Sequence, residues 1–249
     1  MIQEVKDGYV KTETHQGVTT IEFYHPQGNS LPGKILEALG KEIHFAGTHS
    51  ETKVIILKSA GDGSFCAGAS FDELITIKTE AEGQKFFSGY AEIINAARKC
   101  PKFIIGRIQG KCVGGGVGLA AAVDYAIATE KAEIKLSELE LGFGPFVVGP
   151  VIERKIGVAA FNALAIDAAM WRNSEWAKRK GLFAEVHESI ASIHPHTQYR
   201  QDEGYGHPRA SSRGTTRRAM RWEAARVSPS EQAEATNASC ELWFDGCFD

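Results

Sequence analysis

The sequence predicts an α/β protein in which parallel strands are connected by helices, and three patterns indicate it. Residues 9–14 and 18–23 alternate or run β-branched around Gln16-Gly17, which is typical of a β-hairpin. Strand-like runs then alternate with amphipathic helical stripes along the chain. Two loops of small residues, at 61–70 and 111–119, each follow such a strand. Because ligands bind at the carboxyl ends of parallel strands, both loops mark the expected binding edge.

The first half of the chain predicts two long helices. Pro32 suits the first turn of one of them, and an apolar stripe extends it to about His49. Thr79 and Glu82 have the spacing of a capping box before the other, whose stripe continues to Ala97. The other expected elements are strands at 54–57, 103–105 and 125–128, short helices at 71–77 and 119–123, helical segments at 152–156, 159–166 and 175–180, and an edge strand at 183–186.

The composition is typical of a soluble globular protein, with 43% apolar and 24% charged residues. A formal net charge of −3 argues against a nucleic-acid partner. No apolar run approaches the ~20 residues that span a bilayer, and the first seven residues have no signal pattern, so we expect a cytoplasmic protein without a membrane partner. The five cysteines are scattered without a Cys-x-x-Cys pair, which argues against a metal site and a disulfide framework.

The character of the chain changes near residue 190. Residues 191–249 contain no lysine and only three branched aliphatic side chains. So few aliphatic residues do not form a core, which predicts an irregular or weakly docked tail after a core at residues 1–190. Arginines in the tail are interspersed with Glu223, which favours a solvated segment over a nucleic-acid or membrane patch. The shift also fits a reading-frame change near codon 190, which the other frames of the gene would reveal.

Four glycines within 114–118 leave the backbone bare between a strand-like run and a helix-like run. Free N–H groups at a helix start favour negative charge, so this loop is a candidate anion or oxyanion site. A tight turn with close helix packing explains the same residues equally well. Cys112 beside the glycines is interpreted as a buried apolar filler rather than a nucleophile, because no histidine is close in sequence.

Glu138 is a candidate base about twenty residues past the glycines. The loops around Gly68-Ala69 and Gly114-Gly115 each offer backbone N–H donors, and two donors on one carbonyl oxygen form an oxyanion hole, in which one donor is often worth ~3 kcal/mol. A carboxylate near an apolar wall has a raised pKa and can move a proton.

Spacing alone favours a simpler interpretation of Glu138, an exposed charge at a helix start with Ser137 as the N-cap. Glu140, separated from it by one leucine, is the competing base. Asp124 is interpreted as a hydrogen-bonding residue at a strand entry rather than a catalyst.

Three segments in order, 65–69, 109–116 and 137–142, closely resemble the crotonase (enoyl-CoA hydratase/isomerase) superfamily, and the resemblance covers roughly residues 8–190. It implies a crotonase-like ββα spiral, here with an atypical C-terminal tail at 191–249. It also implies acyl-CoA thioester substrates whose carbonyl oxygen accepts two backbone N–H bonds, carried over to Ala69 and Gly115, and a shared enolate intermediate.

The same resemblance implies residues that line the CoA moiety, no cofactor beyond that moiety, and a homotrimer or hexamer. Residues 191–249 do not resemble the apolar helices that complete the acyl pocket and the trimer contacts in the family. The residues carried over as CoA-lining are His25, Pro26, Ala67, Gly68, Phe71 and Gly114.

Hydratases of this family carry two glutamates, one at the position of Glu138 and one where this chain has Gly118. Activating a water is harder without the second carboxylate, whereas shifting a double bond needs one base. Residues 26–31 also resemble the isomerase branch of the family. The resemblance therefore favours Δ3,Δ2-enoyl-CoA isomerisation through Glu138. Hydration, acyl-CoA decarboxylation and non-catalytic acyl-CoA binding are the alternatives. A dinucleotide-binding turn at 116–121 is a weaker match, because that fingerprint opens the first βαβ unit.

Overall fold

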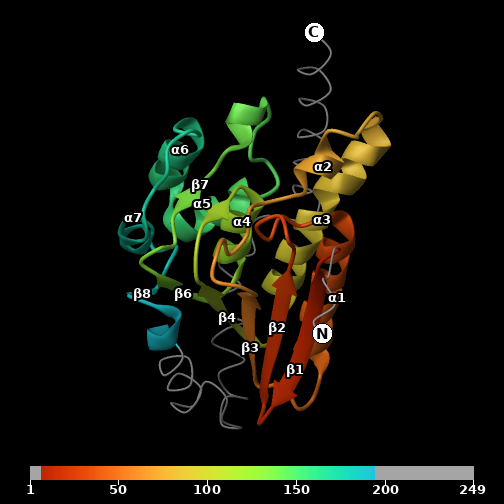
Figure 1. Ribbon diagram of the computed structural model, residues 1–249, viewed down its shortest axis with the longest axis vertical. Coiled ribbons are helices and arrows are strands. Elements are labelled where there is room, and N and C mark those ends of the chain that lie inside the picture. Colours follow the sequence, from red (N-terminus) through yellow and green to blue (C-terminus); the bar gives the residue numbers. More distant parts are fainter. Residues whose placement is uncertain (1–6, 194–249) are drawn as a thin grey trace.

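A six-stranded sheet organises the computed structural model, which describes residues 7–193 (Figure 1). The strand order is β1-β2-β3-β4-β6-β8; β1 and β2 are antiparallel, and every following neighbour is parallel. This confirms the predicted α/β fold with crossover connections. The strands are β1 (Tyr9–His15), β2 (Val18–Tyr24), β3 (Val54–Ser59), β4 (Phe103–Ile108), β6 (Tyr125–Thr129) and β8 (Glu185–His187), the last at the edge as predicted.

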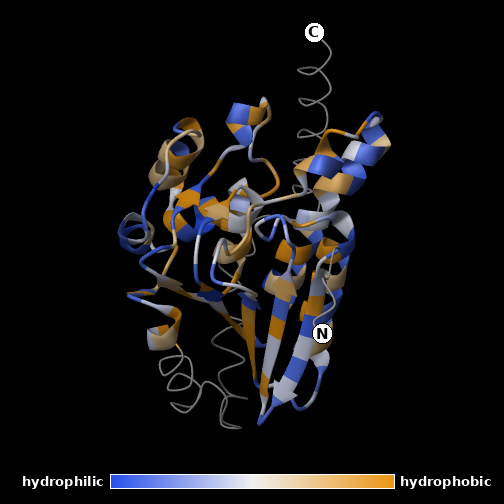
Figure 2. Ribbon diagram, viewed as in Figure 1, coloured by the Kyte–Doolittle hydropathy of each residue, from blue (hydrophilic) through white to orange (hydrophobic). Residues whose placement is uncertain are grey.

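Two long helices, α1 (Gly33–Thr48) and α3 (Glu80–Lys99), pack against each other beside the sheet (Figure 1). The predicted capping box is present at α3: the Thr79 hydroxyl accepts the Glu82 N–H at 3.3 Å, and the Glu82 carboxylate accepts the Thr79 N–H at 3.2 Å. The short helix α2 (Phe71–Leu74) ends three residues before the predicted 77. The strands in the middle of the sheet are the most apolar, as expected for strands covered on both faces (Figure 2).

The helix α4 (Gly115–Ala122) begins four residues earlier than predicted, because the glycines form its first turn rather than a turn before it. All eight of its residues are buried. A Cβ at Gly116 would lie 2.2 Å from the Cys66 carbonyl oxygen, so the glycine allows the helix to pack directly against the preceding loop. The loop therefore serves close packing as well as leaving backbone groups free at the helix start.

The second half of the described chain surrounds α4. The two-stranded sheet of β5 (Cys112–Val113) and β7 (Ile134–Lys135) lies before the 3₁₀ turn η1 (Glu138–Leu141). The turn η1 is followed by α5 (Gly149–Ile156), α6 (Val158–Ile166) and α7 (Ser174–Arg179). The helix α5 packs on α4. No helix within residues 7–193 is long and apolar enough to cross a membrane.

The described chain ends at Ile193, which is fully buried against Val54, Ile105 and Ile127 on one face of the sheet. The first residues after the predicted boundary at 190 therefore dock on the core. The rest of the predicted C-terminal tail, residues 194–249, lies outside the described residues.

Candidate active site

The two small-residue loops lie side by side where β3 and β4 end. Cys66 and Cys112 form a parallel bridge, and the Val113 N–H donates to the Cys66 carbonyl oxygen at 3.0 Å. The bridge brings the backbones of Gly68 and Gly115 together: a Cβ at Gly68 would lie 3.8 Å from the Gly115 nitrogen. Gly68 has a φ of +92°, which favours glycine.

At this junction, the N–H groups of Ala69 and Gly115 have no acceptor within residues 7–193. Gly115 is the first residue of α4, so its N–H has no intrahelical acceptor. In the bridge between Leu31 and Ala69, the Leu31 N–H donates to the Gly68 carbonyl oxygen and the Ser70 N–H donates to the Leu31 carbonyl oxygen. The Ala69 N–H therefore takes no part in the bridge and has no acceptor among the described residues. Both residues line the same pocket, so the two predicted oxyanion donors are brought together.

Glu138 is the first residue of η1 and follows β7 closely in the chain. The Gly114 N–H donates to the carbonyl oxygen of Lys135 in β7 at 2.9 Å, and this bond places Glu138 next to the glycine loop. The glutamate is 8% exposed, and its Oε2 has no hydrogen-bond partner among the described residues. Burial raises the pKa of Glu138 to about 7. A Cβ at Gly114 would lie 3.0 Å from Oε1, so the missing side chain at Gly114 makes room for the carboxylate.

The interpretation of Glu138 as an exposed helix-start charge is therefore wrong, and Ser137 makes no side-chain cap bond. Glu140 is exposed, and its carboxylate lies 2.6 Å from Lys135 Nζ. Of the two acids, Glu138 lines the cavity and Glu140 does not.

Two other sequence interpretations are confirmed. Cys112 is fully buried, and burial raises the pKa of its thiol well above the ordinary value, as expected of a filler rather than a nucleophile. The Asp124 carboxylate accepts the Ile104 N–H at 2.8 Å at the entry to the sheet. In residues 7–193, no group of three His, Cys, Asp or Glu side chains is arranged to hold a metal ion.

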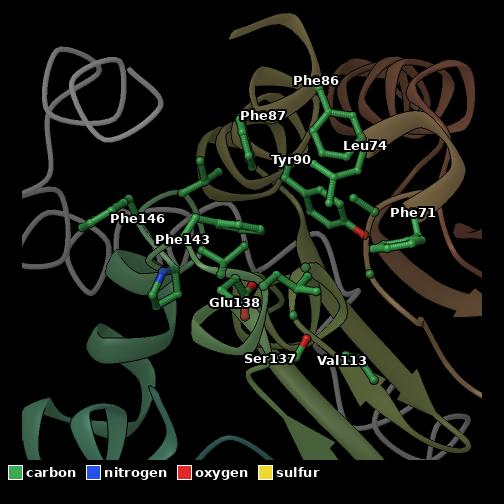
Figure 3. Close-up of a pocket in the computed structure, with 18 of the residues that line it drawn as sticks. Phe71, Leu74, Phe86, Phe87, Tyr90, Val113, Ser137, Glu138, Phe143 and Phe146 are labelled. Atoms are coloured by element: carbon green, nitrogen blue, oxygen red, sulfur yellow. The ribbon is translucent and has the colours of Figure 1, made fainter. Parts of the chain in front are cut away.

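The site opens into a cavity of about 250 Å³ in which Glu138 lies below a group of aromatic rings (Figure 3). Ala67, Gly68, Ala69, Phe71, Gly114, Gly115 and Glu138 all line it, so the fold unites seven of the nine predicted site residues.

The other two, His25 and Pro26, do not line the cavity. Contact with the CoA moiety stays a prediction for all six residues carried over as CoA-lining. Burial lowers the pKa of His25, whose backbone N–H donates to Asn29 Oδ1 at 2.8 Å. Asn29 Nδ2 in turn donates to the carbonyl oxygens of Ala60 and Ser64, at 3.2 and 2.9 Å. The segment therefore braces the loop that carries the Ala69 donor.

Two neighbours of the glycine cluster were not identified from the sequence as site residues. A Cβ at Gly118 would lie 2.7 Å from Val148 Cγ1, so a 4%-exposed apolar side chain fills the space there. The Tyr90 ring packs on Gly115, where a Cβ would lie 2.2 Å from Cζ. The Tyr90 hydroxyl lies 3.5 Å from Cys66 Sγ. In the sequence Tyr90 is one more residue of an apolar helical stripe, and nothing near Val148 indicates its partner.

Comparison with known proteins identifies sequence and structural relatives of the chain. Residues 13–230 match the sequence model of the enoyl-CoA hydratase/isomerase family, a range that extends past residue 190. The mitochondrial methylglutaconyl-CoA hydratase of Rattus norvegicus is 31% identical over 178 residues, covering 71% of this chain and 56% of the relative. A probable enoyl-CoA hydratase of Bacillus subtilis is 31% identical over 145 residues, covering 58% of this chain and 56% of the relative.

Among solved structures, the enoyl-CoA hydratase from Bacillus halodurans superposes with a TM-score of 0.87 at 20% identity, covering 94% of this chain and 95% of that chain. At that identity the likeness shows the fold alone. The chain spans just over half the length of the first two mitochondrial relatives, 56% and 52%.

Proposed function

Because the chain belongs to the enoyl-CoA hydratase/isomerase family, we propose that it moves the double bond of a 3-enoyl-CoA thioester to the 2-position with Glu138 as its one base. The observation that carries the proposal is a single buried carboxylate facing the cavity, while Val148 fills the space beside Gly118. Glu138 is the only acidic residue among the described residues that line the cavity.

In the proposed reaction, the Glu138 carboxylate takes a proton from C2 of the thioester. The electron pair of the broken C–H bond delocalises onto the thioester oxygen, which the N–H groups of Ala69 and Gly115 stabilise as an oxyanion. The protonated Glu138 then returns the proton to C4, and the double bond forms between C2 and C3. The reaction is a proton transfer within one substrate, so it needs no cofactor beyond the CoA moiety.

The environment of Glu138 suits both half-steps. A pKa of about 7 leaves the carboxylate substantially ionised near neutral pH and makes it a stronger base than an ordinary glutamate. Its protonated form is still far more acidic than the carbon acid that it re-forms, so it returns the proton to the dienolate. We expect the rate to rise with pH through about 7, since the first step needs the ionised form.

Hydration of a 2-enoyl-CoA is the second candidate, because relatives are named as hydratases. It requires a water held and activated beside C3. A second carboxylate would assist this step, and the cavity offers none among the described residues.

The test offers 3-hexenoyl-CoA and 2-hexenoyl-CoA separately to the protein and to Glu138→Gln, with Glu140→Gln as the matched control. We expect the 3-enoyl thioester to be converted and Glu138→Gln to lower kcat by at least about 100-fold. The exposed Glu140 is paired with Lys135 outside the cavity, so Glu140→Gln retains activity. Hydration that survives Glu138→Gln would overturn the mechanism. Retained CoA binding without turnover of either thioester would indicate a non-catalytic binder.

A further inference from the structure

Six aromatic residues line the cavity beside Glu138. Three rings, of Phe87, Tyr90 and Phe143, are almost fully buried, and the others are more exposed. Figure 3 shows these rings above Glu138, and they come from α2, α3 and the segment after η1. The aromatic lining residues are Phe71, Phe86, Phe87, Tyr90, Phe143 and Phe146.

The rings present edges and faces to one another rather than stacking. Phe87 meets Phe143 at 5.5 Å between centroids and 67°, and meets Phe86 at 5.3 Å and 83°. Such arrangements are worth about 0.5–1.5 kcal/mol beyond the area they bury. The Phe143 N–H also donates to the Glu138 carbonyl oxygen at 3.3 Å, so the aromatic wall is fixed to the turn that holds the base.

Within residues 7–193, the same wall offers no partner for a negative charge on the acyl group. None of the described lining residues is Lys, Arg or His. Lys135, on the strand before Glu138, has its ammonium 2.6 Å from the Glu140 carboxylate. A substrate carboxylate in the cavity would lose its hydration without a counter-ion and would meet the ionised Glu138.

From these contacts we propose that the acyl group is compact, uncharged and ring-bearing, a phenylalkyl-type group rather than a long chain or a dicarboxylic acyl group. The inference rests on the proposed function, since it names the substrate class of that same site. An engineered apolar cavity of about 150 Å³ binds benzene. Ala67, Gly68, Phe71 and Gly114, which are predicted to contact the CoA moiety, line the same cavity, so its volume of about 250 Å³ leaves room for little more than one ring and the few carbons that join it to the thioester.

The test measures dissociation constants of three saturated thioesters, which need no turnover: 4-phenylbutanoyl-CoA, decanoyl-CoA and adipoyl-CoA. The first two have the same number of acyl carbons, and decanoyl buries more apolar surface, so a ring preference reports on aromatic contacts. We expect the phenyl compound to bind about twofold to tenfold more tightly than decanoyl-CoA and at least about 100-fold more tightly than adipoyl-CoA.

Two variants assign the preference to the wall. Phe143→Leu keeps an apolar side chain but removes the ring beside Glu138, and it should abolish the advantage of the phenyl compound over decanoyl-CoA. Phe45→Leu is the matched control, because Phe45 is 54% exposed and does not line the cavity. Phe87→Leu replaces Phe143→Leu if the latter does not fold by circular dichroism, with the same expected result.

Equal binding of the phenyl and decanoyl compounds, or tight binding of adipoyl-CoA, would overturn this inference and leave the isomerase proposal intact. The isomerase proposal fails by a different result: turnover of 3-hexenoyl-CoA that is unaffected by Glu138→Gln. Binding of none of the three thioesters would also overturn this inference, whereas the isomerase proposal is still decided by turnover of 3-hexenoyl-CoA.

Discussion

Replacing Glu138 by glutamine is predicted to make the protein more stable at alkaline pH while it removes the proposed base. The carboxylate is buried, its Oε2 lacks a hydrogen-bond partner among the described residues, and its pKa is raised from 4.5 to about 7. A raised carboxyl pKa means that the folded state holds a proton which the unfolded chain has released. Between pH 4.5 and about 7, the free energy of unfolding of the natural protein therefore falls as pH rises.

The size of the effect follows from the width of that window. Each pKa unit is worth about 1.4 kcal/mol, so the shift at Glu138 corresponds to about 3 kcal/mol. Glutamine is nearly isosteric and does not titrate. The difference in unfolding free energy between Glu138→Gln and the natural protein should be flat below pH 4.5, rise through the window and level off above about pH 7. Any pH-independent cost of burying the amide shifts the whole curve up or down and leaves its shape unchanged.

Urea unfolding followed by circular dichroism at half-unit steps from pH 4 to pH 8.5 measures this difference. Glu140→Gln is the control for the same chemical change at an exposed position outside the cavity. A flat difference curve for Glu138→Gln would refute the assignment of a buried, proton-binding carboxylate. A difference that falls with pH would mean that the ionised Glu138 is stabilised in the fold by a partner.

Three further outcomes test the surroundings of the site. Gly118→Glu should unfold more readily and gain no hydratase activity, because its side chain meets Val148. Adding Val148→Ala should restore folding. Normal stability of Gly118→Glu alone would contradict the close contact between Gly118 and Val148. Gly115→Ala should lower kcat with 3-hexenoyl-CoA by about 100-fold or more, since its methyl group has no space beside the donor N–H. The control Gly63→Ala, whose methyl group meets open space, should match the natural protein. Equal rates for the two variants would exclude the oxyanion role of Gly115. Asn29→Ala removes three hydrogen bonds and should lower the free energy of unfolding by about 2–3 kcal/mol in urea, with an unchanged midpoint counting against the bracing role.

Local patterns were sufficient for most of the elements. The hairpin, the capping box at Thr79 and the alternation of strands with helices depend on neighbours within a few residues, so the sequence predicts them directly. The start of α4 was misplaced because glycine has a low helix propensity, which close packing against Cys66 outweighs.

The identity of the candidate base was only partly predictable. The motif resemblance pointed to Glu138, but spacing alone favoured an exposed residue and left Glu140 as a rival. Burial separated them, because the pairing of β5 with β7 places one glutamate under the glycine loop and leaves the next acid beside Lys135 in solvent. Whether a carboxylate is desolvated depends on residues distant in the chain, which periodicity does not report.

By itself, the sequence determined the α/β fold, the two glycine-rich loops and the absence of a second glutamate at Gly118. Only the tertiary structure decided what occupies the space beside Gly118, which rings surround Glu138 and which donors stay free. The physical reason is range: backbone propensities and caps act between near neighbours, whereas the Val148 contact, the aromatic wall and the raised pKa of Glu138 arise from packing between segments that are far apart in the chain.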